Sequence, residues 1–227
     1  MKPIKITSRN IMFTQPMNIY ALNIGLILGN QYNYIIDTGL GSGSIDPILE
    51  YIGSTAKPFI VVNTHSHWDH IWGNFMFPNS TIISSPLCYQ LEDKYWERAI
   101  EELGHNIDDT VERCLPNLTF EGKLYFPADD ITIFTSPGHT ADSISVYDGV
   151  DKVLYAGDNI GDTEDTPVPY IETSLEIFRD LIATYQGYDF TTCVSGHNQP
   201  KGREILGQME AGLQQAWENQ PPMPDLE

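Results

Sequence analysis

A run of metal-binding residue types occupies positions 65–70, where the sequence reads HSHWDH. It follows the wholly apolar segment 59–62, whose composition is typical of a buried β-strand. In extended backbone, side chains two residues apart point to the same side, so His65, His67 and Asp69 can converge on one volume. His70 is offset by one residue and can serve a neighbouring volume. This spacing indicates a metal site rather than isolated core histidines.

Three further apolar segments are each followed closely by a histidine or an aspartate, the metal-binding residue types that also occur at positions 65–70. His139, Asp158 and His197 all come directly after a glycine, which lets the backbone bend tightly and turn the next side chain toward a cleft. With positions 65–70 they make seven imidazole and carboxylate donors, enough for two divalent ions that keep a position for water. Zinc, iron and manganese all accept these ligands. Water held between two cations is deprotonated near neutral pH and becomes a nucleophile.

Apolar periodicity predicts the elements that must position these residues. Gly29-Asn30 lies between two strand-like runs and favours a hairpin. Apolar residues recur every four positions over 87–103 and predict a helix that ends at Gly104. The predicted strands are 19–28, 32–36, 59–62, 81–84, 123–126, 131–135, 143–147, 153–156 and 191–194, and the predicted helices are 44–52, 87–103, 174–185 and 203–217.

The order of these elements gives two halves, each with strands followed by helices. We expect an α/β architecture in which two sheets pack together with helices outside, in one domain spanning 1–227. The 68 residues between His70 and His139 are more than the strands need, and predict a helical excursion at 86–116. Its aromatic residues Tyr89, Tyr95 and Trp96 can cap the metal site, pack on the sandwich or form a contact in a homodimer.

The chain is acidic, since 31 Asp and Glu side chains against 12 Lys and Arg give a formal net charge of −19. This charge repels phosphate backbones and anionic lipids, so we expect no large nucleic-acid interface and no membrane partner. A small anionic substrate stays compatible, because a local field in a cleft can oppose the net charge. Cys88, Cys114 and Cys193 have no CxxC spacing, and no apolar run has the ~18 residues of a spanning helix. With no secretory signal at the start of the sequence, we expect a cytoplasmic protein.

Several side chains near the predicted metal site have two interpretations each. Lys201 and Arg203 can anchor a substrate carboxylate or phosphate, or simply solvate the start of a helix. Trp68, within the metal-binding run, and Trp72, just after it, can form a pocket wall or pack in the core. His105 follows the predicted helix end and is expected to be exposed.

These motifs resemble those of the metallo-β-lactamase-fold hydrolase superfamily. The resemblance covers nearly the whole chain and rests, in that family's order, on the segments 37–39 (Asp-Thr-Gly), 65–70, 137–140, 157–158 and 196–197. It implies a four-layer αββα sandwich of two mixed β-sheets flanked by helices, with the site at one edge.

The resemblance also implies a role for each ligand. His65, His67 and His139 would hold the first metal, Asp69, His70 and His197 the second, and Asp158 would bridge the two. It gives Asp37 the role of orienting a ligand histidine or its loop. A turn aspartate beside Gly39 is an equally good interpretation of that residue.

Branches of the superfamily differ at these positions. True β-lactamases have a cysteine in place of Asp158, and flavodiiron proteins have a glutamate in place of His67. Persulfide dioxygenases bind a single iron with fewer ligands. The pattern looks most like the glyoxalase II and lactonase branches. However, 30 residues follow His197, fewer than the glutathione-binding region of glyoxalase II, and Gly161 stands where lactonases have a tyrosine.

The predicted function is a metal-dependent hydrolase acting on a small molecule. A hydroxide bridging two divalent ions, most simply Zn²⁺, attacks an ester, lactone or thioester carbonyl, and the second ion stabilises the oxyanion. Asp158 holds both ions, and Asp69 orients the hydroxide and passes on its proton. The alternatives are a phosphodiesterase acting on a small nucleotide, and an iron-dependent redox protein with the same ligands.

Overall fold

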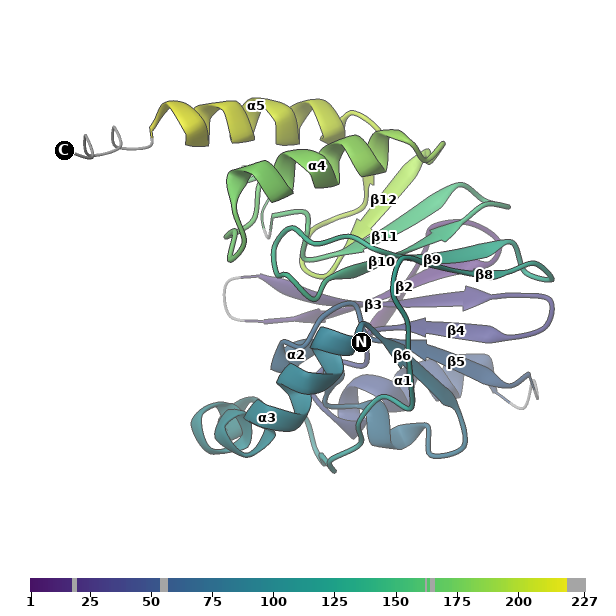
Figure 1. Ribbon diagram of the computed structural model, residues 1–227. Coiled ribbons are helices and arrows are strands. Elements are labelled where there is room, and N and C mark those ends of the chain that lie inside the picture. Colours follow the sequence, from purple (N-terminus) through teal and green to yellow (C-terminus); the bar gives the residue numbers. More distant parts are fainter. Residues whose placement is uncertain (18–19, 54–56, 162, 164–165, 220–227) are drawn as a thin grey trace.

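Two β-sheets face each other in the computed structural model, which describes residues 1–17, 20–53, 57–161, 163 and 166–219 (Figure 1). The first sheet has seven strands in sequential order. Its strands are β1 (Lys2–Lys5), β2 (Asn10–Pro16), β3 (Ala21–Leu28), β4 (Asn33–Ile36), β5 (Phe59–Val62), β6 (Thr81–Ser84) and β7 (Leu118–Thr119). Pairing is antiparallel from β1 to β4 and parallel from β4 to β7, so this sheet is mixed.

The second sheet has six strands, in the order β13-β12-β11-β10-β9-β8. They are β8 (Lys123–Phe126), β9 (Ile131–Thr135), β10 (Ile144–Asp148), β11 (Val153–Gly157), β12 (Thr192–Ser195) and β13 (Lys201–Gly202). Only the pair β11–β12 is parallel, so this sheet is also mixed.

Helices cover both outer faces. In Figure 1, α4 and α5 lie on the second sheet, and α1, α2 and α3 lie on the side of the first. The helices are α1 (Ser42–Ile52), α2 (Trp68–Ile71), α3 (Pro86–Leu103), α4 (Leu175–Gln186) and α5 (Ile205–Glu218), with 3₁₀ turns η1 (Asn74–Met76) and η2 (Gly104–Asn106). The expected four-layer αββα sandwich is therefore confirmed. None of the described helices is both long and apolar enough to cross a bilayer.

Alternation along the strands builds three apolar layers. In β11, Val153 and Tyr155 face the first sheet, while Leu154 and Ala156 pack beneath α4 and α5. Burial on both faces explains why the sequence of this strand is continuously apolar. The strands that end at the metal-binding residues are therefore fixed on both sides.

Serine side chains cap two of the helices. Ser85 precedes α3 and its hydroxyl accepts a hydrogen bond from the Cys88 N–H at 3.1 Å, with Pro86 at the first helical position. Ser174 caps α4 in the same way, through the Ile177 N–H. The predicted helix 87–103 is confirmed to within one residue.

Other predicted boundaries differ. Within the predicted helical excursion at 86–116, residues 86–106 are helical and 107–116 are irregular, so the excursion is helical only in its first part. The backbone carbonyls of Asp108 and Thr110 instead accept hydrogen bonds from Gly43 N and Ser42 N, at 3.0 and 2.9 Å, at the start of α1. Strands β1 and β2 were not predicted individually, and the start of the predicted strand 19–28 lies partly outside the described residues.

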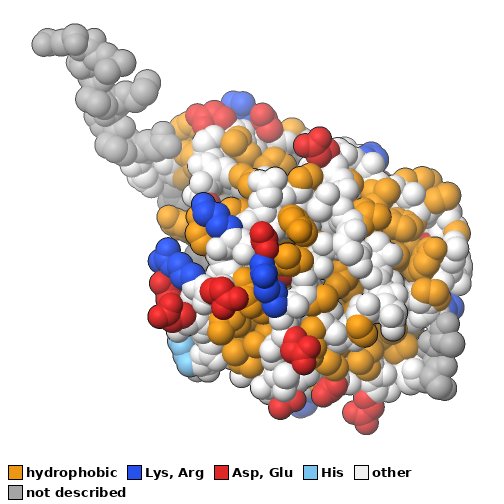
Figure 2. Space-filling model, turned by 60° about the horizontal axis from the view of Figure 1, so that its bottom comes forward, with side chains coloured by type: hydrophobic (Ala, Val, Ile, Leu, Met, Phe, Trp, Pro, Cys, Tyr) orange, Lys and Arg blue, Asp and Glu red, His pale blue; other side chains and the backbone are white. Residues whose placement is uncertain are grey.

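On the face of the molecule that Figure 2 shows, acidic side chains are scattered rather than gathered in one patch. Figure 2 turns the side of α1 and α3 forward, and there Asp and Glu side chains lie among hydrophobic and basic ones.

Candidate metal centre

The seven predicted ligands meet at one edge of the sandwich, where strands of both sheets end. The chain leaving β5 carries His65 and His67, and the short helix α2 carries Asp69 and His70. From the second sheet come His139 between β9 and β10, Asp158 directly after β11, and His197 after β12. All are buried except His67, which is about one-third exposed.

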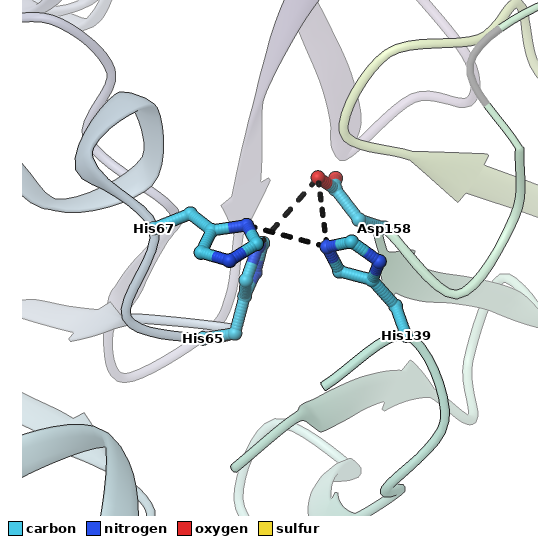
Figure 3. A group of neighbouring side chains, drawn as sticks. All are labelled: His65, His67, His139 and Asp158. Carbon is cyan, nitrogen blue, oxygen red and sulfur yellow. Dashed lines mark hydrogen bonds and ion pairs between the residues drawn. The ribbon is translucent and has the colours of Figure 1, made fainter. Parts of the chain in front are cut away.

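The ligand atoms form two groups. His65, His67, His139 and Asp158 make one group, and Asp69, His70 and His197 make the other. Within each group all the ligand atoms lie within 4.8 Å of one another. Figure 3 shows the four side chains of the first group pointing toward a common volume, with His65 and His67 on one side and His139 and Asp158 on the other.

Asp158 lies between the two groups. Its Oδ2 lies 3.6 Å from His65 Nε2, 4.0 Å from His139 Nε2, 3.3 Å from His70 Nε2 and 3.1 Å from His197 Nε2. One carboxylate oxygen therefore faces imidazole nitrogens of both groups.

The residues present fit divalent metal ions. His65 Nε2, His70 Nε2 and Asp158 Oδ1 are buried without a hydrogen-bond partner, and such atoms are costly unless something else satisfies them. Ligands about 2 Å from a tetrahedral ion lie roughly 3.3 Å apart, close to the separations around Asp158 Oδ2. Imidazole and carboxylate suit zinc, iron or manganese.

Three histidines are oriented by acceptors on the far side of the ring. The Nδ1–H of His139 donates to the Tyr170 carbonyl at 2.6 Å, and that of His197 to the Ala21 carbonyl at 2.8 Å. The Nδ1–H of His70 donates to Asp37 Oδ2 at 2.9 Å. Because a carbonyl or carboxylate oxygen only accepts, each Nε2 keeps its lone pair for the centre.

Asp37 supports both groups. Its Oδ2 also accepts a hydrogen bond from the Thr64 hydroxyl at 2.8 Å. The oxygen of that hydroxyl, Thr64 Oγ1, lies 3.1 Å from His65 Nδ1. Because the Thr64 hydroxyl donates its hydrogen to Asp37, its oxygen accepts a hydrogen bond from the Nδ1–H of His65. The orienting role expected for Asp37 agrees with this geometry. Its position in a turn agrees too, because its φ is 65° and its Oδ1 accepts from Thr64 N.

The ring of His67 faces the neighbouring ligand His139 through Nδ1 and not through Nε2. Its Nδ1 lies 3.2 Å from His139 Nε2, and its Nε2 faces Glu172 Oε1 at 3.3 Å. Glu172 belongs to the loop before α4, whose backbone N–H at that residue donates to the His139 carbonyl at 2.8 Å. Sequence reasoning missed Glu172, since one more acid in an acidic chain gives no signal.

The pKa values of the ligand side chains shift in different directions within the centre. Burial lowers the pKa of His65 and of His67, which favours the neutral ring that binds a cation. Burial also acts to lower the pKa of His197, but the Asp158 carboxylate outweighs it and raises the pKa to about 9. Burial acts to raise the pKa of Asp158, while His70, His197 and His65 hold that pKa well below its usual range. Metal binding would therefore release protons from the second group.

The other candidate residues separate into core and surface. Trp72 is fully buried and packs with Trp96, so core packing is the correct interpretation for both. Of the two interpretations of Arg203, the structure disfavours the substrate anchor, because its guanidinium donates to the carbonyls of Gln186 and Tyr188 at the end of α4. His105 is exposed, as predicted.

Two adjoining hollows of about 600 and 270 Å³ open beside His67. His67, Tyr95, Ala99 and Glu172 line both of them. Trp68 lines the smaller one, so a pocket wall is the better interpretation for this tryptophan. The exposed face of α3 thus forms one side of the approach to the metal centre.

Sequence comparison finds relatives among hydrolases. The acyl-coenzyme A thioesterase MBLAC2 of Gallus gallus is 30% identical over 164 residues, which cover 62% of this chain and 58% of that protein. MBLAC2 of Homo sapiens is 24% identical over 163 residues, with the same coverage. The chain therefore matches less than two thirds of the length of these relatives.

Structural comparison finds the same fold in solved metallo-β-lactamases. FIM-1 of Pseudomonas aeruginosa superposes with a TM-score of 0.73 at 18% identity, covering 95% of each chain. The enzyme of Hirschia baltica gives a TM-score of 0.70 at 18% identity, covering 93% of this chain and 97% of that one. At this identity the likeness shows the fold alone.

The family model also matches across both sheets. The model described as the metallo-beta-lactamase superfamily matches residues 19–197, a range that contains every ligand of both groups. The matched range covers most of the chain, and it agrees with the shared fold and with the hydrolase relatives. The chain belongs to the metallo-beta-lactamase superfamily.

Proposed function

We propose that this chain is a metal-dependent hydrolase that binds two divalent ions, most simply Zn²⁺, and cleaves a small-molecule thioester, ester or lactone. The observation that carries this proposal is the position of Asp158 Oδ2, within 3.1–4.0 Å of imidazole nitrogens from both ligand groups. One carboxylate oxygen in that position can be shared by two cations.

The metals would supply the central chemistry. Two divalent ions, when bound, acidify the water they share and polarise the substrate carbonyl. His65, His67 and His139 would hold one ion, and Asp69, His70 and His197 the other. Asp37 would keep the lone pairs of His65 and His70 directed at the centre, because the other nitrogen of each ring is engaged through its carboxylate.

Asp69 would handle the proton. Its Oδ2 lies 3.4 Å from His197 Nε2 and its Oδ1 lies 3.8 Å from His70 Nε2, so this carboxylate borders the second group. From there it can accept the proton of the attacking water and return it to the leaving group. A thiol has a pKa near 8.5, so a thiolate leaves with little help from an acid.

A thioester is the substrate bond that the comparisons favour. The most similar relatives named above are acyl-coenzyme A thioesterases at 24–30% identity. Apolar side chains on α3 and at Trp68 beside His67 agree with an acyl substituent.

The test combines metal content with a substrate panel. The purified chain, loaded with zinc, is assayed by elemental analysis and against thioesters, esters, lactones and bis-p-nitrophenyl phosphate. We expect two metal ions per chain and a carbonyl substrate as the best one. Asp158→Asn should bind fewer ions and lose at least about 100-fold in kcat/KM, because it removes the shared charge.

The control is Asp180→Asn, an exposed aspartate on α4, which should leave metal content and rate unchanged. Asp158→Asn with two ions and full activity would rule out the bridging role. Preferred turnover of the phosphodiester would favour the nucleotide alternative, and two irons with no hydrolysis would favour a redox protein.

A further inference from the structure

The two hollows beside His67 have a mostly apolar wall. Their apolar lining residues are Trp68, Leu91, Tyr95, Ala99 and Leu103. Tyr95 is 42% exposed, so its ring is available at the surface of the approach. A ligand that reaches the metal centre from this side would cover these side chains and gain from their burial.

The charged residues in the lining leave a carboxylate in excess. Arg98 is the only lysine or arginine among the described residues that line either hollow, and its Nε already donates to Glu102 Oε1 at 2.8 Å. Glu172 lines both hollows, is about half exposed, and has the His67 ring 3.3 Å away as its ion-pair partner. The local charge therefore has the same sign as the net charge of −19.

Among the described residues, the hollows thus offer a phosphate or carboxylate no lysine or arginine that is free of a carboxylate partner. Such anions are bound by unpaired guanidinium or ammonium groups, or by backbone N–H groups at a helix N-terminus. The sequence left a small anionic substrate open on the ground that a cleft can oppose the net charge. In this cleft, Glu102 and Glu172 add to the net charge instead.

We propose that the substrate is an uncharged thioester with an apolar acyl group, and that Glu102 and Glu172 select against carriers bearing phosphate groups. This inference rests on the proposed function. The selection concerns charges along the hollow, because divalent ions would attract the carbonyl oxygen of every thioester alike. It separates this chain from the relatives named for acyl-coenzyme A, of which it matches 58% of the length.

A matched substrate pair tests the proposal on the zinc-loaded chain. Octanoyl-pantetheine and octanoyl-coenzyme A share the acyl group and the thioester, and only the second carries the phosphorylated nucleotide. We expect kcat/KM at low salt to be about tenfold or more higher for the pantetheine thioester. The gap should narrow as salt rises, because added ions screen exposed charges over a Debye length that shortens from roughly 10 Å at 0.1 M to roughly 3 Å at 1 M.

Charge-removing variants assign the selection to named residues. Glu172→Gln should raise kcat/KM for the coenzyme A thioester about fivefold, the effect of one unit charge at ~4 Å in water. Glu102→Gln should do the same or more, because it also frees Arg98. Each variant is scored by the ratio of kcat/KM for the coenzyme A thioester to kcat/KM for the pantetheine thioester, because Glu172 also faces the ring of His67. Glu97→Gln, an exposed glutamate of α3 outside the lining, is the matched control and should change neither.

Several outcomes would overturn the proposal. Equal or preferred turnover of octanoyl-coenzyme A would refute it while leaving the proposed function intact. A gap that does not respond to salt or to the two glutamine variants would mean that size, not charge, decides. No turnover of any carbonyl substrate by the zinc-loaded chain would remove the proposed function, and this inference with it.

Discussion

Asp37 connects the two ligand groups at the level of single side chains. One of its oxygens accepts from the His70 ring and, through the Thr64 hydroxyl, supports the His65 ring. The other oxygen accepts from the Thr64 backbone N–H at 2.7 Å. Since such partners fix ring orientation and raise ligand basicity, this buried carboxylate should affect metal binding by both ligand groups.

We predict that Asp37→Asn weakens metal binding without disturbing the turn. Asparagine tolerates positive φ, so the backbone at 65° is retained, but its amide nitrogen cannot accept a hydrogen bond. Metal affinity should fall about 10- to 100-fold, measured by competition with a chromogenic chelator. Asp130→Asn, at φ 54° outside both ligand groups, is the matched control. Unchanged affinity in Asp37→Asn would contradict the orienting role.

At the level of elements, the parallel pair β11–β12 places two ligands side by side. Asp158 follows β11 and His197 follows β12, and the Gly196 N–H donates to the Gly157 carbonyl at 3.0 Å. The two glycines are needed for different reasons. Gly157 has a φ of 55°, whereas Gly196 is packed so closely that an added Cβ would meet Asp158 Oδ1 and lie 2.7 Å from His70 Cε1.

Gly196→Ala is therefore predicted to damage the centre more than the fold. The methyl group would push against Asp158, so bound metal per chain should fall at equal protein concentration, measured by elemental analysis after desalting. Gly207→Ala in α5 is the matched control, because nothing lies within 4 Å of its added Cβ. That variant should keep its metal and gain about 0.5–1 kcal/mol from helix propensity. Full metal content in Gly196→Ala would contradict the prediction.

The sequence predicted elements best where a local signal was complete. The helix predicted over 87–103 carries a four-residue apolar repeat and a glycine stop, and α3 forms at that place. Strand β1 is exposed and contains two lysines, so no alternation identified it. The segment 108–115 stays irregular because its carbonyls bond to the start of α1, a contact between residues more than sixty positions apart.

At the scale of the whole molecule, polar contacts join the two sheets at both ends. At the metal edge the ligands come from both sheets. Near the opposite end of β10, Arg9 Nε donates to the buried Asp148 at 2.7 Å, and Asn10 Nδ2 donates to the same carboxylate at 2.7 Å. The two edges are separated by the length of one strand, since Ile144 at the other end of β10 bonds to Thr64. The apolar layer between the sheets is thus closed at each end.

Stability against pH should report one buried acid on α3. Glu92 is 2% exposed, neither of its carboxylate oxygens has a hydrogen-bond partner, and burial raises its pKa from 4.5 to about 8. The folded state therefore prefers the protonated acid. The contribution of this acid to the free energy of unfolding is complete below its unfolded-state pKa, and it is lost as the pH rises toward its folded-state pKa.

Glu92→Gln removes this ionisation, so its free energy of unfolding should increase relative to that of the wild type as the pH rises. We expect nearly equal free energies of unfolding at pH 4.5, and a variant more stable by a few kcal/mol, on the order of magnitude that linkage gives, at pH 8.5. Urea unfolding of the metal-loaded proteins measures the difference. Glu97→Gln, exposed on the same helix, controls for surface repulsion. A difference that stays constant with pH would argue against a neutral Glu92.

The sequence by itself determined the donor set. Residue types, alternation along extended backbone and glycines before strand-end ligands are local properties, so all seven donors could be named, and the structure brings them together at one edge. Tertiary structure alone decided how they are arranged. Asp158 Oδ2 faces both groups and Glu172 faces His67 because sheet packing sets distances between residues about a hundred positions apart. No local pattern encodes such distances, and the charge lining the hollows beside His67 depends on them.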